Sequence, residues 1–404
     1  MTAADETTSL IPPPPLDAAE AVARARALVP AVRAAASEAE VQRRIPPSLL
    51  AAFREAGLVR MLTPRRFGGH ALGFDAFIAA TMELARADAS VAWCFAFLNI
   101  HAWLLAGFPE QAQVEIWTAD PDMTIATITI PAGQVRVVDG GYRLSGTWPW
   151  ASGIDHCNRA ILAGFLPPAP DAPPGPPDLG LFIVSRADFT IHDTWQVAGL
   201  RATGSHDVVI ADAFVPTHRV ASLVDLREGT APGRALHPEP MYHLPMLSTL
   251  ATSLAAPILG AALGAYEAWC EALRGRITTF SREASAELSH HQIRVAETSA
   301  ELECAQLLLQ RALDILRPGG ALNLAQRVQL RRDHAYLATL CLRAVERMYN
   351  SLGAPANNDS GPLQRYWRDM HAMVAHTCVN FDSAGVNFGR MALGLPLNPR
   401  DPLF

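Results

Sequence analysis

The period of the hydrophobic residues changes twice along this 404-residue chain, and these changes constrain the fold more than any other feature. From residue 16 to about residue 120 apolar residues recur at helical spacing, whereas from 121 to 222 they alternate as in β-strands. The helical period then returns from 223 to 404. One ordinary core would not organise so long a chain, so the pattern indicates three packed regions after a short N-terminal segment.

The first and last regions carry the signals of helix ends. Pro46 and Pro47 predict a helix start and Gly57 its end. Further helices are expected at 75–85 and at 90–105, the second apolar on all sides and therefore buried. Long helices are expected at 247–273, 291–316, 322–352 and 363–393. Four long helices with short connections predict a C-terminal four-helix bundle.

The middle region contains short β-type runs separated by turn signals. The runs are 124–130, 135–138, 142–145, 160–163, 181–184 and 208–210. Asp139-Gly140-Gly141 predicts a hairpin turn between the second and third runs. The proline-rich segment 167–177 is expected to be an exposed loop. The fold class is therefore α+β: a helical domain, a central antiparallel barrel or sandwich, and the helical bundle.

Composition and charge exclude several classes of protein. The net charge is -6 and Lys and Arg form no stripe, so nucleic acid is not an expected partner. Residues 1–15 are acidic and proline-rich, which predicts a flexible N-terminus without a secretory signal and a cytoplasmic protein. Prolines and hydroxyl residues interrupt the apolar stretch 244–263, which favours a buried helix over a membrane span. The six dispersed cysteines indicate packing residues and no metal site.

Three stretches combine aromatic, hydroxyl and charged residues in a specific way. They are Gly-Thr-Trp-Pro-Trp-Ala-Ser-Gly-Ile-Asp-His-Cys at 146–157, Gly-Leu-Arg-Ala-Thr-Gly-Ser-His-Asp at 199–207, and Arg-Tyr-Trp-Arg-Asp-Met-His at 365–371 followed by His376 and by 389–396. In the first stretch, Trp150 and Ser152 have the spacing that places an aromatic wall and a hydroxyl on one face of a strand, as a flat ring requires. In the second, Arg201, Thr203 and Ser205 suit a phosphate, although composition alone fits a plain turn equally well.

The order of the regions and these stretches resemble the acyl-CoA dehydrogenase superfamily over nearly the whole chain after the first fifteen residues. Within it, the chain is similar to the reduced-flavin-dependent two-component (group D) monooxygenases, such as oxygenase components of 4-hydroxyphenylacetate-type hydroxylases. The resemblance implies that Trp150 and Ser152 contact the flavin ring, and that Arg201, Thr203 and Ser205 bind its phosphate. The resemblance further implies that His376, Ser152 and His101 are catalytic and that His101, Trp93 and His371 bind substrate.

The usual base of an acyl-CoA dehydrogenase is missing. Neither Glu nor Asp lies between Met370 and Phe381, where many relatives carry a Glu-Gly-Thr, and His376 occupies the interval. A histidine with its unperturbed pKa of about 6.5 suits taking or sharing a phenolic proton. Glu267 and Glu271 remain alternative carboxylates on another helix.

Aromatic residues near the first stretch are candidates for the wall of the pocket, although such clusters are more often core packing. They are Trp93, Phe95, Phe97, Trp103 and Phe108. No Gly-x-Gly-x-x-Gly follows a β-type run, so the chain shows no nicotinamide site and its electrons must come from elsewhere. We therefore expect a separate NAD(P)H:flavin reductase to supply reduced FMN or FAD.

The function expected is hydroxylation of a small phenolic or other aromatic substrate by O2 through a flavin hydroperoxide. Three alternatives stay open: an N-oxygenase of an amine such as an amino sugar, an acyl-CoA dehydrogenase, and a non-catalytic scaffold on the same fold. By resemblance the protein is expected to be a homotetramer.

Overall fold

The helices of the computed structural model follow the order that the sequence predicts. The structure describes residues 16–167, 178–278, 282–359, 361–398 and 401, so the predicted flexible N-terminus and nearly all of the predicted proline-rich loop lie outside it. The N-terminal helices are α1 (Ala18–Gln42), α2 (Pro47–Glu55), α3 (Phe74–Ala85), α4 (Ala89–Leu105) and α5 (Glu110–Ala119). The later helices are α6 (Leu223–Glu228), α7 (Met246–Gly275), α8 (Ser289–Leu316), α9 (Leu324–Leu352), α10 (Leu363–Val374) and α11 (Phe381–Ala392).

Eight strands form two four-stranded sheets between these helical regions. They are β1 (Ile125–Ile128), β2 (Gln134–Val138), β3 (Gly141–Ala151), β4 (Arg159–Phe165), β5 (Leu179–Ser185), β6 (Thr190–His192), β7 (His206–Pro216) and β8 (Val220–Ser222). The sheet orders are β1-β4-β5-β8 and β2-β3-β7-β6. The predicted turn joins β2 to β3, with Gly140 at a φ of 75° that glycine adopts without a steric cost.

One strand pair departs from the predicted antiparallel arrangement. β1 and β4 pair in parallel, whereas the other ladders are antiparallel. The chain passes through the second sheet, as β2 and β3, before it returns as β4. Because no hairpin joins β1 to β4, nothing in the connection requires them to run in opposite directions.

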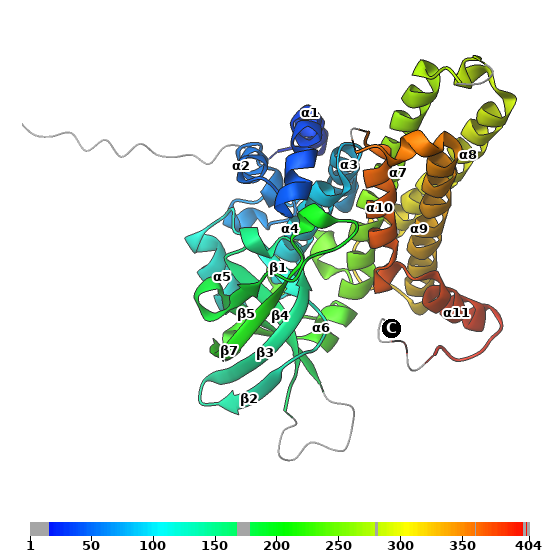
Figure 1. The fold of residues 1–404 in the computed structure, drawn as a ribbon. Coiled ribbons are helices and arrows are strands. Elements are labelled where there is room, and N and C mark those ends of the chain that lie inside the picture. Colours follow the sequence, from blue (N-terminus) through cyan, green and yellow to red (C-terminus); the bar gives the residue numbers. More distant parts are fainter. Residues whose placement is uncertain (1–15, 168–177, 279–281, 360, 399–400, 402–404) are drawn as a thin grey trace, which may run out of the picture.

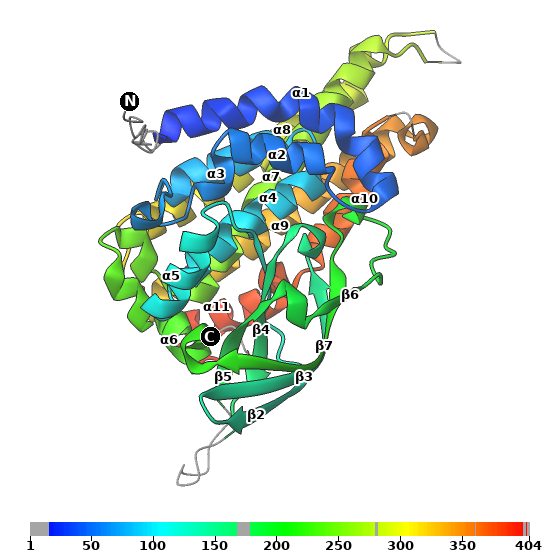
Figure 2. The same cartoon turned by 90° about the vertical axis from the view of Figure 1, so that its left-hand side faces the viewer.

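The three regions pack around α4. Figure 1 shows α1–α4 above the strands, with the long helices α7, α9 and α10 beside both. In Figure 2 the long helices α7 and α9 lie behind α3 and α4. Asp88 caps α4 by accepting the backbone N–H of Val91 at 2.9 Å. Nearly every side chain of α4 is buried, as its all-round apolar sequence predicts.

Among the described residues only α7 is long and apolar enough to span a membrane, and 83% of its most apolar window is buried inside the protein. This agrees with the buried helix expected from the interrupted apolar stretch.

The fourth helix of the bundle is broken, which corrects the predicted helix at 363–393. α10 ends at Val374 and α11 begins at Phe381. Between them His376 has an extended backbone (φ -68°, ψ 132°), and Asn380 caps α11 by accepting the N–H of Ser383 at 3.0 Å. The interval contains neither proline nor glycine, so only the capping residue Asn380 signals the break in the sequence.

Candidate active site

Three rings on one face of α4 form an apolar wall. Trp93, Phe97 and His101 follow one another at intervals of four residues, which places them on the same side of the helix. The ring centroids of Trp93 and Phe97 are 5.2 Å apart, and those of Phe97 and His101 are 5.1 Å apart. The wall thus joins two of the predicted substrate-binding residues, Trp93 and His101.

The break between α10 and α11 brings His376 against this wall. Its ring lies edge-on to Trp93, with 5.9 Å between centroids. Nδ1 of His376 accepts the backbone N–H of Cys378 at 3.2 Å, so the proton of the neutral imidazole is on Nε2. Burial lowers the pKa of His376 to about 4. The ring is therefore neutral at pH 7 and a weaker base than a histidine with the unperturbed pKa of about 6.5.

His101 has the opposite arrangement of its proton. Its Nδ1 donates to the carbonyl oxygen of Ile125 at 2.9 Å, which leaves Nε2 as the acceptor. Burial lowers the pKa of His101 to about 4 as well. His376, which lies against Trp93 at one end of the wall, therefore presents a hydrogen-bond donor. His101, at the other end, presents an acceptor.

A directed chain of hydrogen bonds connects the wall to the β region. The indole N–H of Trp93 donates to Ser152 Oγ at 3.3 Å, and Ser152 Oγ and Ser205 Oγ are 2.8 Å apart. Ser205 Oγ is 2.7 Å from Thr203 Oγ1, which donates to the carbonyl of Leu200 at 2.9 Å. An indole N–H only donates and a carbonyl only accepts, so each hydroxyl donates toward Leu200. Ser152 consequently accepts from Trp93 and donates to Ser205, and one lone pair of its oxygen stays available.

This chain joins the first two sequence stretches, and a buried carboxylate joins the third. Gly153 donates its N–H to the carbonyl of Thr203 at 2.8 Å. Asp369 on α10 accepts the N–H of Leu200 at 2.6 Å. Gly199 lies so close to α10 that a Cβ there would be 2.0 Å from the carbonyl oxygen of Arg368. The glycine and the aspartate therefore fix the loop that carries Thr203 and Ser205.

Trp150 is the exposed member of the site. A register shift between β3 and β7 falls between Trp148 and Ala151, and Trp150 has a φ of 69°. Its side chain is 61% exposed, unusual for so large an apolar group. An indole held outward next to Ser152 fits a flat aromatic ring.

The buried Nε of Arg201 has no hydrogen-bond partner among the described residues, which fits an anionic group such as the flavin phosphate.

The structure does not bring His371 to this site. His371 bonds to Glu346 and packs against Trp367, with its side chain 43% exposed.

The alternative carboxylates also lie elsewhere: Glu267 pairs with Arg86 and Glu271 with Arg274, and both are at least half exposed. Neither provides the buried base that a dehydrogenase needs.

The remaining aromatic candidates belong to the core. Phe95 packs between Phe53 and Phe77, and Phe108 is fully buried. Trp103 lies beneath the guanidinium of Arg234 and donates to a backbone carbonyl.

Comparison with known proteins identifies the family. Residues 17–120 match the family described as Acyl-CoA dehydrogenase, N-terminal domain, and residues 252–381 match Acyl-CoA dehydrogenase, C-terminal domain. The chain belongs to the acyl-CoA dehydrogenase family.

Individual relatives narrow this assignment. The chain is 36% identical to the flavin-dependent monooxygenase oxygenase subunit HsaA of Rhodococcus jostii (strain RHA1), over 93% of this chain and 98% of the relative. It is 35% identical to the FADH(2)-dependent resorcinol hydroxylase oxygenase component of Rhizobium sp. (strain MTP-10005), over 93% and 94%. The structure of XiaF from Streptomyces sp. with FADH2 and glycerol superimposes with a TM-score of 0.88 at 28% identity, over 95% and 97%. Within the family, this chain is a flavin-dependent monooxygenase of the oxygenase-component kind.

Proposed function

We propose that this protein hydroxylates a small phenolic substrate held against the Trp93–Phe97–His101 wall. The observation that carries the proposal is the contact between Trp93 and both His376 and Ser152. This contact places a neutral imidazole and a hydroxyl oxygen beside the same indole. Reduced FMN or FAD, when bound, supplies the activation of O2 and the transfer of one oxygen atom to the ring.

Ser152 binds the flavin edge as a hydrogen-bond acceptor. Its own hydrogen is committed to Ser205, so its free lone pair suits an N–H group. The nitrogen beside the oxygen-reacting carbon of a flavin carries hydrogen only when the flavin is reduced. Ser152 therefore favours the reduced cofactor, Trp150 covers its ring, and Arg201 holds its phosphate.

The two histidines orient the phenol. Nε2 of His376 donates to the phenolic oxygen and stabilises negative charge there, which raises the electron density of the ring. Nε2 of His101 accepts a hydrogen bond from a second polar group of the substrate or from its hydroxyl. The apolar wall excludes water from the reacting atoms.

The partners follow from this reaction. A separate NAD(P)H:flavin reductase supplies the reduced flavin by diffusion, a proposal supported by the name of one relative, the oxygenase component of a FADH(2)-dependent resorcinol hydroxylase, and by the missing nicotinamide motif. We further propose that the protein is a cytoplasmic homotetramer with domains at 16–120, 121–222 and 223–404.

The test is product analysis with isotopically labelled O2. Purified protein, photoreduced flavin and a panel of phenols are mixed under 18O2, and the products are examined by mass spectrometry. The proposal expects a hydroxylated phenol carrying one labelled oxygen atom. Labelled hydrogen peroxide without labelled product for every phenol would contradict it.

A further inference from the structure

Leu200, the last acceptor of the hydroxyl chain, has a strained backbone. Its φ of 54° and ψ of 34° lie in the left-handed region, which residues other than glycine rarely adopt. In this conformation its carbonyl oxygen accepts the Thr203 hydroxyl at 2.9 Å, the Thr203 N–H at 3.1 Å and the Trp195 indole N–H at 2.9 Å. A rotation out of the left-handed region would turn this carbonyl away from Thr203. The direction of the chain therefore depends on the conformation of Leu200.

The carboxylate of Asp369 holds Leu200 in this conformation from the other side of the residue. It accepts the N–H of Leu200 at 2.6 Å. Asp369 is 2% exposed and Leu200 4% exposed, so water cannot readily replace the carboxylate as the acceptor. A strained backbone persists only where its surroundings determine it. The bond from Leu200 to Asp369 therefore stabilises a conformation that leucine would otherwise leave.

The residues before Leu200 are docked on the same turn of α10. A Cβ at Gly199 would lie 2.0 Å from the carbonyl oxygen of Arg368 and 2.9 Å from the backbone nitrogen of Asp369. Only glycine permits so close an approach of two backbones. The guanidinium of Arg368 donates to the carbonyl of Ala198 at 2.6 Å. The segment 198–200 thus follows the position of α10 closely.

The same turn of α10 is also tied to the helix that begins the hydroxyl chain. Nε of Arg365, four residues before Asp369, lies 3.4 Å from the carboxylate of Asp88. Asp88 is the cap of α4, and α4 carries Trp93, the first donor of the chain. One turn of α10 therefore fixes both the helix of the first donor and the residue that is the last acceptor, Leu200.

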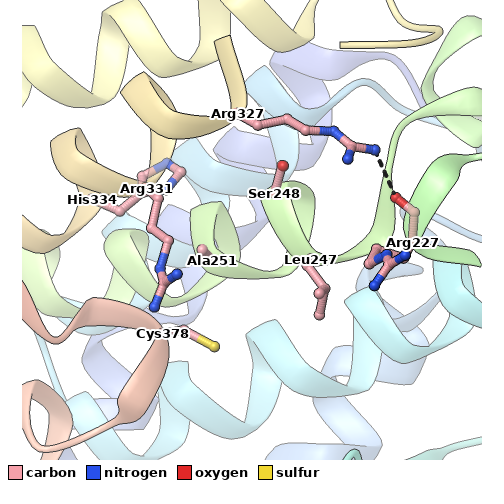
Figure 3. A pocket seen from close by; sticks show the side chains of 8 residues that line it. All are labelled: Arg227, Leu247, Ser248, Ala251, Arg327, Arg331, His334 and Cys378. Atoms are coloured by element: carbon pink, nitrogen blue, oxygen red, sulfur yellow. Dashed lines mark hydrogen bonds between the residues drawn. The ribbon is translucent and has the colours of Figure 1, made fainter. Parts of the chain in front are cut away.

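The turn that follows α10 is packed closely as well. Cys378 lies in this turn, two residues after His376, and lines a cavity together with Leu247 of α7 and Arg331 of α9 (Figure 3). The cavity measures about 20 Å3, which is room for a single water molecule. With both of its ends packed, α10 is a firm support for Leu200.

Leu200 needs an acceptor oxygen at this place rather than a negative charge. Burial and the neighbouring carboxylate of Asp88 raise the pKa of Asp369. The other charged groups around Asp369 are Arg365 and Arg368 of α10, and Glu40 of α1 pairs with Arg368 at 2.6 Å. A protonated carboxyl still accepts an N–H through its carbonyl oxygen. An amide at position 369 therefore preserves the function, whereas a methyl group removes it.

We propose that Asp369 is a positioning residue that gives the flavin site its preference for the reduced cofactor. By holding Leu200 left-handed, it keeps the final acceptor in place, and each hydroxyl of the chain then donates toward Leu200. The oxygen of Ser152 consequently stays an acceptor for the N–H of reduced flavin. This inference deepens the proposed function and rests on its assignment of Ser152 to the flavin edge.

Two substitutions of Asp369 separate position from charge. In Asp369→Ala, Leu200 is expected to leave the left-handed region, so that Ser152 becomes free to donate to oxidised flavin. The ratio of dissociation constants for oxidised and reduced FAD, from anaerobic fluorescence titrations, should fall about fivefold or more, the value of roughly one hydrogen bond. Asp369→Asn keeps an acceptor oxygen and should stay within about twofold of the wild-type ratio. An unchanged ratio in Asp369→Ala, or an equal fall in Asp369→Asn, would overturn the proposal.

Leu200→Gly distinguishes this role from a general loss of stability. Glycine adopts the left-handed conformation without a steric cost and does not need Asp369 to hold it. In the Leu200→Gly background, Asp369→Ala should therefore change the ratio by less than about twofold. The matched control is Asp333→Ala, which removes another buried carboxylate, bonded to Arg311 and Arg332, and should leave the ratio unchanged. Equal falls in both backgrounds, or in the control, would contradict the proposal.

Gly199→Ala tests the same contact if Asp369→Ala does not fold. Its methyl group would push the loop away from α10 and leave the carboxylate intact, so the ratio should fall by a similar factor. A wild-type ratio in this variant would count against Asp369. Comparison with Ser205→Ala shows which assignment fails. A fall in Ser205→Ala without one in Asp369→Ala would refute the role of Asp369 alone, and no change in either variant would refute the assignment of Ser152.

Discussion

Trp93 donates its indole N–H to the hydroxyl of Ser152 across the boundary between α4 and β3. This bond is the first of the directed chain that ends at the carbonyl of Leu200. Its chemical consequence is that Ser152 has no hydrogen to offer and acts as an acceptor. We infer that the direction of these hydrogen bonds allows Ser152 to distinguish the reduced from the oxidised flavin.

Replacing Ser205 tests this direction. In Ser205→Ala the hydroxyl of Ser152 loses its acceptor and becomes free to donate, so the variant should bind oxidised flavin relatively better. We expect the ratio of dissociation constants for oxidised and reduced flavin to fall about fivefold or more, the value of roughly one hydrogen bond. Anaerobic fluorescence titration of both forms gives the ratio. An unchanged ratio would show that Ser152 does not distinguish oxidised from reduced flavin.

Trp150 allows flavin binding to be separated from stability. In Trp150→Gly, glycine takes the position with a φ of 69°. Glycine adopts this conformation without a steric cost, so the melting temperature should not fall. Reduced flavin should bind about tenfold more weakly because the stacked ring is lost. A lower melting temperature together with unchanged flavin affinity would mean that Trp150 is a packing residue.

His376 is expected to control hydroxylation without holding the fold. His376→Ala should lower the rate of product formation about a hundredfold, the lower end for a positioned proton-handling group. Reduced flavin should still bind, and its oxidation should yield hydrogen peroxide. His371→Ala is the matched control, since this exposed histidine bonds to Glu346 away from Trp93. Equal losses in both variants would argue against a specific role for His376.

The buried histidines make folding stability depend on pH. Burial lowers the pKa of His101 to about 4, so its folded form binds fewer protons than its unfolded form. The contribution of the neutral His101 ring to folding stability is fully present above the unfolded pKa of about 6.5. It is lost as the pH falls toward 4.

From pH 7.5 to 5 this histidine contributes a loss of about 2 kcal/mol, from 1.36 kcal/mol per pKa unit. Between pH 7.5 and 5 the free energy of unfolding, measured in urea, should therefore fall by about 2 kcal/mol less in His101→Gln than in the wild type. A loss of equal size in both proteins would exclude His101 as a source of the pH dependence.

The sequence predicted the elements well where a pattern is local, and less well where contacts are distant. The apolar α4 and the hairpin at Gly140 follow from neighbouring residues alone. The parallel pairing of β1 with β4 depends on a path through the other sheet, and no short-range signal encodes it. The break around His376 was missed because Asn380 is a weak marker inside an apolar periodic segment.

The candidate site could likewise be predicted from the sequence only in part. Trp150, Ser152, Thr203 and Ser205 are proposed from motifs in the sequence, whereas the bond from Trp93 and the direction of the hydroxyl chain appear only where α4 packs against the β region. Arg227 lines the same cavity as Arg327 and Arg331, about a hundred positions later, and single arginines in amphipathic helices give no sign of this proximity.

The central claim is that reduced flavin bound between Trp150 and His376 reacts with O2 in a site closed to water. Stopped-flow mixing of the protein–flavin complex with oxygenated buffer, without substrate, tests it most directly. The claim predicts at least two phases, with an early absorbance change that differs from oxidised flavin and then decays slowly. A single phase leading directly to oxidised flavin, at the rate of free flavin, would contradict it.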